Sequence, residues 1–149
     1  MQAIKNYFNS GATKSYEFRK QQLLLLQSTI KKYESEISEA LHQDLGKSKA
    51  EAYTTETGMV LTEIRLMLKD LKKWMQPKSV ATNLMNLPST SKMYYDPLGV
   101  VFIISPWNYP FQLLFTPLVG AIAGGNCVVL KPSEYTPATT AITEKIITI

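Results

Sequence analysis

The sequence predicts an α/β fold, in which a helical amino-terminal segment precedes the start of a parallel β-α-β unit. Residues 1–78 repeat apolar side chains at helical spacing. The last third of the chain alternates short β-branched runs with segments of helix length. We therefore expect three parts: a helical part in residues 1–78, an arm or hairpin in 79–97, and the start of a sheet domain in 98–149.

Composition and charge limit the class of protein. The chain has 149 residues, of which 45% are hydrophobic, and this fits one globular domain. Its net charge of +4 lies in residues 1–78, which hold 13 basic and 9 acidic side chains. The lysines recur among glutamates on expected helical surface, so we expect a solvated face and no nucleic-acid partner. A single cysteine, and an amino terminus unlike a signal peptide, favour a cytoplasmic location.

Two long helices are expected in the first part. The first covers residues from about 15 to 45, and Gly46 ends it. Ser48 and Glu51 have the spacing of a capping box, which predicts that a second helix begins there. That helix should end before Pro77, because a proline disfavours helical geometry in the preceding residue. The proline-rich stretch that follows is expected to form an extended arm or hairpin.

A β-α-β pattern follows the arm. Residues 99–104, GVVFII, contain no polar side chain, which is typical of a strand buried on both faces of a parallel sheet. Residues 111–123 should form a helix that Pro117 kinks or splits. The run CVVLK, which starts at Cys127, predicts a second strand, and Thr136 should cap another helix. Parallel strands joined by a helical crossover indicate a β-α-β unit at the start of a sheet domain.

Residues 97–130 contain no charged side chain and no histidine, so this segment is either buried in protein or placed in a membrane. A spanning helix needs about 20 uninterrupted apolar residues. This run is broken by several prolines, by Asn108 and Gln112, and by a glycine pair. A β-α-β unit explains both the missing charge and the breaks, and a membrane-associated helical protein stays the less favoured alternative.

Polar residues follow both expected strands. Ligands of parallel sheets bind beyond the carboxyl ends of the strands, so we expect residues 105–108 and 131–134 to converge on a ligand. The ammonium of Lys131 and the carboxylate of Glu134 suit the vicinal diol of a ribose. The amide of Asn108 suits an oxygen that gains negative charge in a reaction. Purely structural roles stay open as well: a strand-end lysine, a loop glutamate and an asparagine helix cap.

The segments PWNYPF and AIAGGNCVVLKPSE closely resemble the aldehyde dehydrogenase superfamily. FRKQQLLLLQSTIKKYESEISEAL, DLGKSKAEAY and PLGVVFIISPWNYPF resemble its class 3 branch, so the resemblance runs from about Ser15 onward. It implies an incomplete aldehyde dehydrogenase fold, in which residues 98–149 are the start of a Rossmann-like NAD(P)-binding domain. It also implies an enzyme that oxidises aldehydes to carboxylic acids through a cysteine thiohemiacetal. It also implies NAD as cofactor, with NADP tolerated, and a homodimer whose oligomerisation strands include residues 82–95. No metal site is expected.

The resemblance also implies roles for matching residues. Asn108 corresponds to the asparagine that stabilises the oxyanion of the thiohemiacetal. The turn after the first strand corresponds to one that lines the cofactor, and KPSE contains the pair that holds the adenosine ribose. Cofactor contacts are therefore expected from Ser105, Pro106, Trp107, Lys131, Ser133 and Glu134.

The family's nucleophilic cysteine and its general-base glutamate lie beyond the KPSE motif, and 15 residues follow that motif here. We therefore expect the chain to be the amino-terminal piece of a longer enzyme and to be inactive alone. Cys127, at a buried strand start without a basic neighbour, should be structural, and His42 should lie on the surface. Two alternatives stay open: a non-catalytic nucleotide-binding or interaction module, and a CoA-acylating or semialdehyde dehydrogenase.

Overall fold

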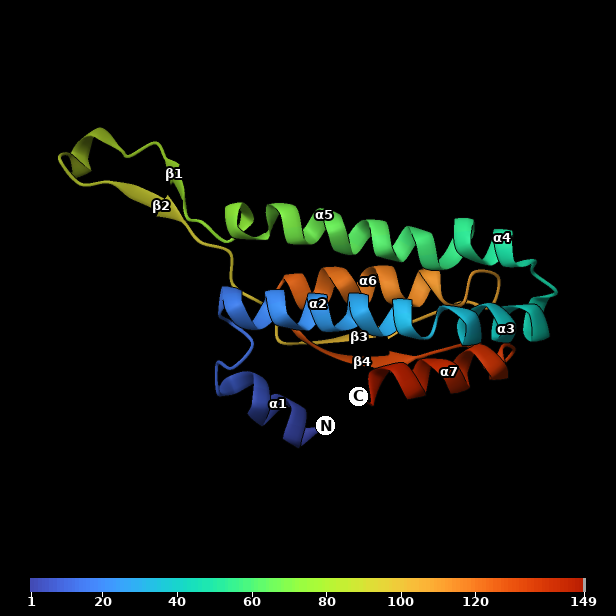
Figure 1. Ribbon diagram of the computed structural model, residues 1–149. Coiled ribbons are helices and arrows are strands. Elements are labelled where there is room, and N and C mark those ends of the chain that lie inside the picture. The colour runs from blue at the N-terminus through green and yellow to red at the C-terminus, as the bar shows by residue number, and fades with distance from the viewer. Residues whose placement is uncertain (149) are drawn as a thin grey trace.

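The computed structural model describes residues 1–148, which form a two-stranded parallel sheet, helices packed against it and a hairpin that projects from one end (Figure 1). The strands are β3 (Val100–Ile104) and β4 (Cys127–Lys131), and α6 (Gln112–Ala123) connects them and packs against both. α2 (Tyr16–Lys32) packs in turn on α6. The predicted α/β class, with helices first and a parallel β-α-β unit after them, is confirmed.

The first expected helix is in fact two helices. α2 ends and α3 (Glu34–Leu45) begins at Tyr33, whose backbone lies at φ −100° and ψ 12°. Apolar spacing does not reveal this break, because Ile30 and Ile37 on either side of it are both fully buried in the same core. Gly46 ends α3 as predicted, with a left-handed φ of 68° that glycine adopts without strain.

The second expected helix begins where the sequence predicts. The hydroxyl of Ser48 accepts a hydrogen bond from the backbone N–H of Glu51 at 3.2 Å, and α4 (Lys49–Ala52) starts there. The helical run continues into α5 (Gly58–Trp74), which packs along α2 and α6. It ends before Pro77, as expected.

A single π-helical turn, Tyr53–Thr57, separates α4 from α5 and was not predicted. The backbone N–H of Gly58 donates to the carbonyl oxygen of Tyr53, five residues earlier. A Cβ on residue 58 would lie 2.6 Å from that oxygen, so a larger side chain would force the turn to shift. The turn carries Glu56, whose side chain is completely buried.

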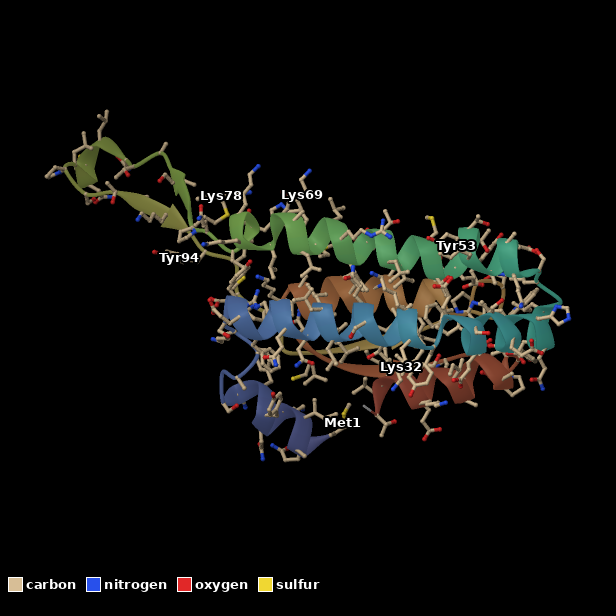
Figure 2. The ribbon with its side chains drawn as sticks, in the orientation of Figure 1. Met1, Lys32, Tyr53, Lys69, Lys78 and Tyr94 are labelled. Carbon is tan, nitrogen blue, oxygen red and sulfur yellow. The ribbon has the colours of Figure 1, made fainter. Side chains whose placement is uncertain are left out.

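An antiparallel hairpin follows α5. β1 (Lys78–Val80) pairs with β2 (Ser91–Met93), and one turn of 3₁₀-helix lies between them. The tip of the hairpin stands clear of the helices in Figure 2, and Leu84 and Met85 near that tip are 82% and 89% exposed. The extended arm expected from the sequence is present, and its role in oligomerisation stays a prediction.

The sheet is covered on one face. Ile103 faces α6 and is 6% exposed. Phe102 and Ile104 are 58% and 65% exposed on the other face, where none of the described helices covers them. The prediction that this strand is buried on both faces is therefore wrong for residues 1–148, because α6 covers only one of them. α1 (Gln2–Asn9), which the sequence analysis did not predict, contacts both strands.

The uncharged region forms short elements. Pro117 lies inside α6 without dividing it, so the predicted helix is a single element. None of the helices in residues 1–148 combines the length and the apolarity that a membrane crossing requires.

The last helix is capped from a distant part of the chain. α7 (Pro137–Ile147) begins after Thr136 as predicted, but the Thr136 side chain makes no capping bond. Instead, the carboxylate of Asp44, at the end of α3, accepts hydrogen bonds from the backbone N–H groups of Ala138 and Thr139 at 3.1 and 2.7 Å. It also accepts the Thr139 hydroxyl at 2.8 Å. This carboxylate therefore fixes the start of α7 against α3.

Candidate functional site

The polar residues after the two strands meet at one edge of the sheet. Ile104 pairs with Lys131, and the backbone N–H of Ser105 donates to the Lys131 carbonyl at 3.1 Å. Residues 105–108 and 131–134 therefore leave the sheet side by side. The convergence expected from a parallel sheet is present at the carboxyl ends of β3 and β4.

The turn after β3, residues 105–111, is called the Asn108 turn below. Ser105 is 4% exposed, and its hydroxyl lies 3.1 and 3.2 Å from the carbonyl oxygens of Pro106 and Pro110. Trp107 is 55% exposed, and Pro106 and Asn108 are exposed too. Ser105 therefore supports the turn from within, while its three neighbours lie where a ligand can contact them.

The side chain of Asn108 has no hydrogen-bond partner within residues 1–148. The structural alternative, that it caps α6, is wrong, because another residue supplies that cap. The Oε2 atom of Glu56 accepts from the backbone N–H groups of Phe111 and Gln112 at 3.1 and 2.7 Å. The Asn108 amide is therefore available to donate to a bound molecule.

A buried ion pair lies beneath the turn. The Nζ atom of Lys47 is 2.5 Å from Oε1 of Glu56, and the two side chains are 7% and 0% exposed. The same ammonium donates to the backbone carbonyl of Asn108 at 3.2 Å and lies 4.1 Å from the centre of the Tyr109 ring. Neither residue is predicted from the sequence, since its local pattern does not distinguish it from the exposed lysines and glutamates around it.

Lys131 and Glu134 form an exposed ion pair at 2.5 Å, with side chains that are 48% and 66% exposed. The hydrogen bond from Lys131 lowers the pKa of Glu134 below its ordinary value, assisted by a backbone hydrogen bond and the lysine charge. An exposed pair costs little to open. Its ammonium donors and carboxylate acceptors fit the two hydroxyls of a ribose.

Ser133 lies between these two residues but is only 6% exposed. Its hydroxyl accepts a hydrogen bond from the backbone N–H of Tyr135 at 3.3 Å, and its carbonyl accepts from the hydroxyl of Thr140 at 3.2 Å. Ser133 therefore supports the turn after β4 in the way that Ser105 supports the turn after β3. Direct contact of these two serines with a cofactor stays a prediction.

Cys127 lies at the opposite end of β4. It is the first residue of the strand, and Lys131 is the last, a separation of about 13 Å along an extended chain. Burial raises the pKa of its thiol. A half-buried thiol at that end does not share a site with Asn108. His42 is exposed, and its Nδ1 atom lies 3.1 Å from the carbonyl oxygen of Lys47.

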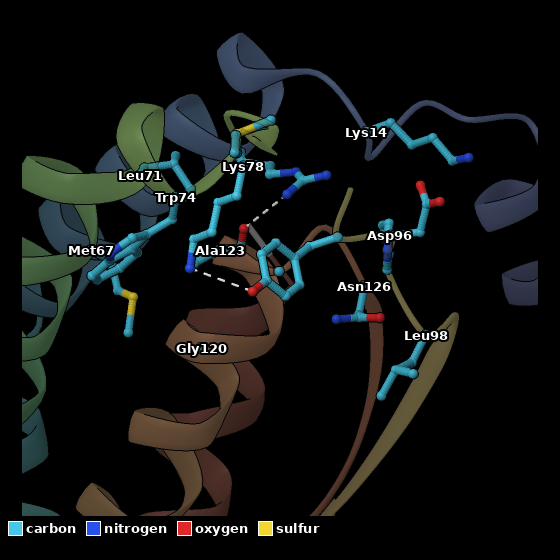
Figure 3. Close-up of a pocket in the computed structure, with 15 residues that line it drawn as sticks. Lys14, Met67, Leu71, Trp74, Lys78, Asp96, Leu98, Gly120, Ala123 and Asn126 are labelled. Atoms are coloured by element: carbon cyan, nitrogen blue, oxygen red, sulfur yellow. Dashed lines mark hydrogen bonds between the residues drawn. The ribbon is translucent and has the colours of Figure 1, made fainter. Parts of the chain in front are cut away.

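A pocket of about 650 Å³ lies at the base of the hairpin, away from the predicted site (Figure 3). The ammonium of Lys78, which Figure 3 labels, lies 3.4 Å from the hydroxyl of Tyr95. Leu98 and Asn126, which also line the pocket, precede the two strands, so the pocket lies at the amino edge of the sheet. Parallel sheets bind ligands at the carboxyl edge, and we therefore place the candidate site at Asn108.

Known proteins are similar to this chain in sequence and in fold. Residues 1–148 match the model of the aldehyde dehydrogenase family. A 4,4'-diaponeurosporen-aldehyde dehydrogenase of Staphylococcus aureus is 50% identical, over 96% of this chain and 31% of that protein. An aldehyde dehydrogenase of Craterostigma plantagineum is 46% identical, over 97% of this chain and 30% of that protein.

A solved structure agrees with these matches. The substrate-bound state of Staphylococcus aureus AldH superimposes with a TM-score of 0.95 at 49% identity, over 97% of this chain and 32% of that chain. The chain thus spans about a third of the length of the relatives it matches and corresponds to their amino-terminal part. The incomplete fold predicted from the sequence is confirmed. From its sequence and its fold, this chain belongs to the aldehyde dehydrogenase family.

Proposed function

We propose that this chain supplies the oxyanion donor and the ribose-binding residues of an enzyme that oxidises aldehydes to carboxylic acids through a cysteine thiohemiacetal. The observation that carries the proposal is the Asn108 side chain, an exposed amide without a partner in residues 1–148. It lies at the carboxyl edge of β3, on a turn with buried supports. In this proposal the nucleophilic cysteine and the general-base glutamate come from outside the chain.

The proposed role of Asn108 follows from the charge that the reaction creates. Attack of a thiolate on an aldehyde carbon leaves the aldehyde oxygen with negative charge. A side-chain N–H that is already in place stabilises that charge without reorganisation at the moment of reaction. Asn108 can do this without giving up a hydrogen bond, while Lys47 holds its backbone carbonyl.

The proposed cofactor is NAD, with NADP tolerated, held through its adenosine ribose by Lys131 and Glu134. The carboxylate accepts hydrogen bonds from both ribose hydroxyls and repels a 2′-phosphate, and the lysine offsets part of that repulsion. When bound, the nicotinamide accepts a hydride from the substrate. Pro106 and Trp107 offer further exposed contact surface on the adjacent turn.

The proposal also includes a cytoplasmic homodimer in which the hairpin contacts a second copy. The exposed apolar side chains of Leu84 and Met85 support that contact.

A second candidate function, a non-catalytic nucleotide-binding module, is favoured by one observation. The cysteine at position 127 has a raised pKa and lies at the far end of β4 from Asn108. We therefore expect the 149-residue chain alone to show no aldehyde oxidation.

The test uses a chimeric enzyme in which this chain replaces the matching segment of the Staphylococcus aureus relative. Asn108→Ala should lower kcat by about 10²- to 10³-fold, the usual cost of losing one oxyanion donor, and leave NAD affinity unchanged. The measurements are kcat with a panel of aldehydes, NAD affinity and Tm on the same preparation.

Asn126 provides a matched control. Its side chain accepts from the backbone N–H of Gly99 at 2.9 Å and donates to the carbonyl of Ala121 at 3.3 Å, at the opposite edge of the sheet. Asn126→Ala should lower Tm and keep the kcat of the folded enzyme. An Asn108→Ala enzyme with lowered Tm and unchanged kcat would make the oxyanion proposal wrong.

A further inference from the structure

The completely buried carboxylate of Glu56 needs an explanation beyond stability. Its two oxygens accept from Lys47 at 2.5 Å and from the backbone N–H groups of Phe111 and Gln112 at 3.1 and 2.7 Å. Removing two charges from water is costly, and well-packed apolar residues often stabilise a protein as much as a buried pair does. The other two partners of Glu56 are the last residue of the Asn108 turn and the first residue of α6.

Lys47 contacts the backbone of Asn108 itself. Its ammonium has three donors. One goes to Glu56 and another to the backbone carbonyl of Asn108 at 3.2 Å, and the charge lies over the Tyr109 ring. Together the two side chains hold the backbone at residue 108 and again at residues 111 and 112. The free amide of Asn108 therefore projects from a backbone that is held at residue 108 and again shortly after it.

The π-helical turn explains why Glu56 can reach this position. One such turn adds a residue to the helix, and each residue of a helix turns the side-chain direction by about 100°. Glycine at residue 58 leaves room for the turn, since a Cβ there would lie 2.6 Å from the Tyr53 oxygen and force a shift. π-Helical turns are rare and occur often at functional sites. Gly58, the turn and Glu56 thus form one local arrangement.

We propose that Lys47 and Glu56 are positioning residues for Asn108, which hold its amide in place for the oxyanion before substrate binds. The proposal rests on the function proposed above. A displacement of about 1 Å at a reacting group can cost about 10²-fold in rate. Loss of the pair should therefore lower kcat far more than it changes the KM for NAD, because the ribose-binding residues Lys131 and Glu134 lie on the other turn.

The main test uses the double variant Lys47→Met, Glu56→Gln in the chimera. Both charges are removed together, because one unpaired buried charge alone could unfold the protein. We expect kcat to fall by about 10- to 100-fold, the range set by a displacement of up to about 1 Å, and the KM for NAD to stay within about twofold. The matched control removes the exposed pair Lys145–Glu36, at 2.7 Å between α7 and α3, by Lys145→Met, Glu36→Gln. That control should keep kcat.

A second comparison shows whether the pair acts through Asn108. In a background that already carries Asn108→Ala, the double variant should lower kcat by less than about twofold more, because residues that act as a unit are not additive. If the double variant lowers kcat by the same factor in both backgrounds, its role is merely structural and the proposal is overturned. An unchanged kcat in the Lys47→Met, Glu56→Gln enzyme overturns it too.

Hydrogen exchange gives a readout that does not need turnover. Backbone amides of residues 106–113 in the chimera should exchange at least about tenfold faster in the double variant, since the acceptor of two of them is weakened. Gly58→Ala should accelerate the same amides although it removes no charge, because it shifts the turn that carries Glu56. Unchanged exchange there would overturn the proposal. An inactive unmodified chimera, by contrast, would count against the proposed function, and the exchange data would still decide the role of the pair.

Discussion

Replacing Asp44 with alanine should destabilise the protein by detaching the start of α7 from α3. The carboxylate accepts three hydrogen bonds, at 3.1, 2.7 and 2.8 Å, two of them from backbone N–H groups of the first turn. Loss of a helix cap costs about 0.5–2 kcal/mol, and loss of a charged acceptor about 1.5–3 kcal/mol. Asp44 is half-buried, so water can replace part of the hydrogen bonding that its carboxylate supplies. We expect the free energy of unfolding to fall by about 2–3 kcal/mol.

The assay is urea denaturation of the 149-residue chain followed by circular dichroism, with Tm as a second measure. For a chain of this size the expected loss corresponds to about 5–10 °C in Tm. Asp44→Asn, which keeps one acceptor oxygen at the cap, should lose clearly less than alanine does. Asp70 on α5 is also half-buried, and Asp70→Ala should stay within about 0.5 kcal/mol. If Asp44→Ala costs no more than Asp70→Ala, the cap does not stabilise α7.

Two further predictions concern the cofactor and the cysteine. Glu134→Gln in the chimera should raise kcat/KM for NADP relative to NAD, because the carboxylate that repels the 2′-phosphate is gone; an unchanged ratio would mean that Glu134 does not contact the ribose. Burial raises the pKa of Cys127, so its thiolate should be scarce at neutral pH. Iodoacetamide should therefore label it more slowly than a small free thiol at pH 7, and faster as the pH rises toward that pKa. Cys127→Ala should keep the turnover of the chimera, and rapid labelling or lost turnover would contradict the structural role.

Local patterns in the sequence predicted the helix ends and strands that are determined by residues close together along the chain. Ser48 and Glu51 lie within one turn of each other, so their spacing in the sequence shows the cap. Gly46 adopts its φ of 68° because glycine has no Cβ. The β-branched runs predicted two strands, and the sequence order of strand, helix and strand predicted their parallel pairing. That pairing brings the candidate site residues to one edge of the sheet.

Contacts between residues far apart in the sequence determine the structural features that were not predicted. The helix break at Tyr33 keeps the apolar stripe in place, so periodicity cannot show it. The outward exposure of Phe102 depends on what packs against the sheet, not on the residue itself. The caps of α6 and α7 come from Glu56 and Asp44, which are 55 and 94 residues away along the chain from the first amides they bind. A glutamate in a helical stretch gives no sign that it caps another helix.

These two caps show how the helical part and the sheet part depend on each other. Each strand of the β-α-β unit ends at the candidate site, and the helix near each of those ends starts with amides bound to a carboxylate from residues 44–56. A negatively charged group near the amino terminus of a helix stabilises the helix, whichever part of the chain supplies the group. Carboxylates brought from α3 and from the π-helical turn also fix where each helix begins. The positions of the Asn108 turn and of the Lys131–Glu134 turn therefore depend on the helical part, although it offers no predicted contact with substrate or cofactor. Changes at Asp44, Lys47, Glu56 or Gly58 should consequently alter the site at a distance, and those at exposed residues of α5 should not.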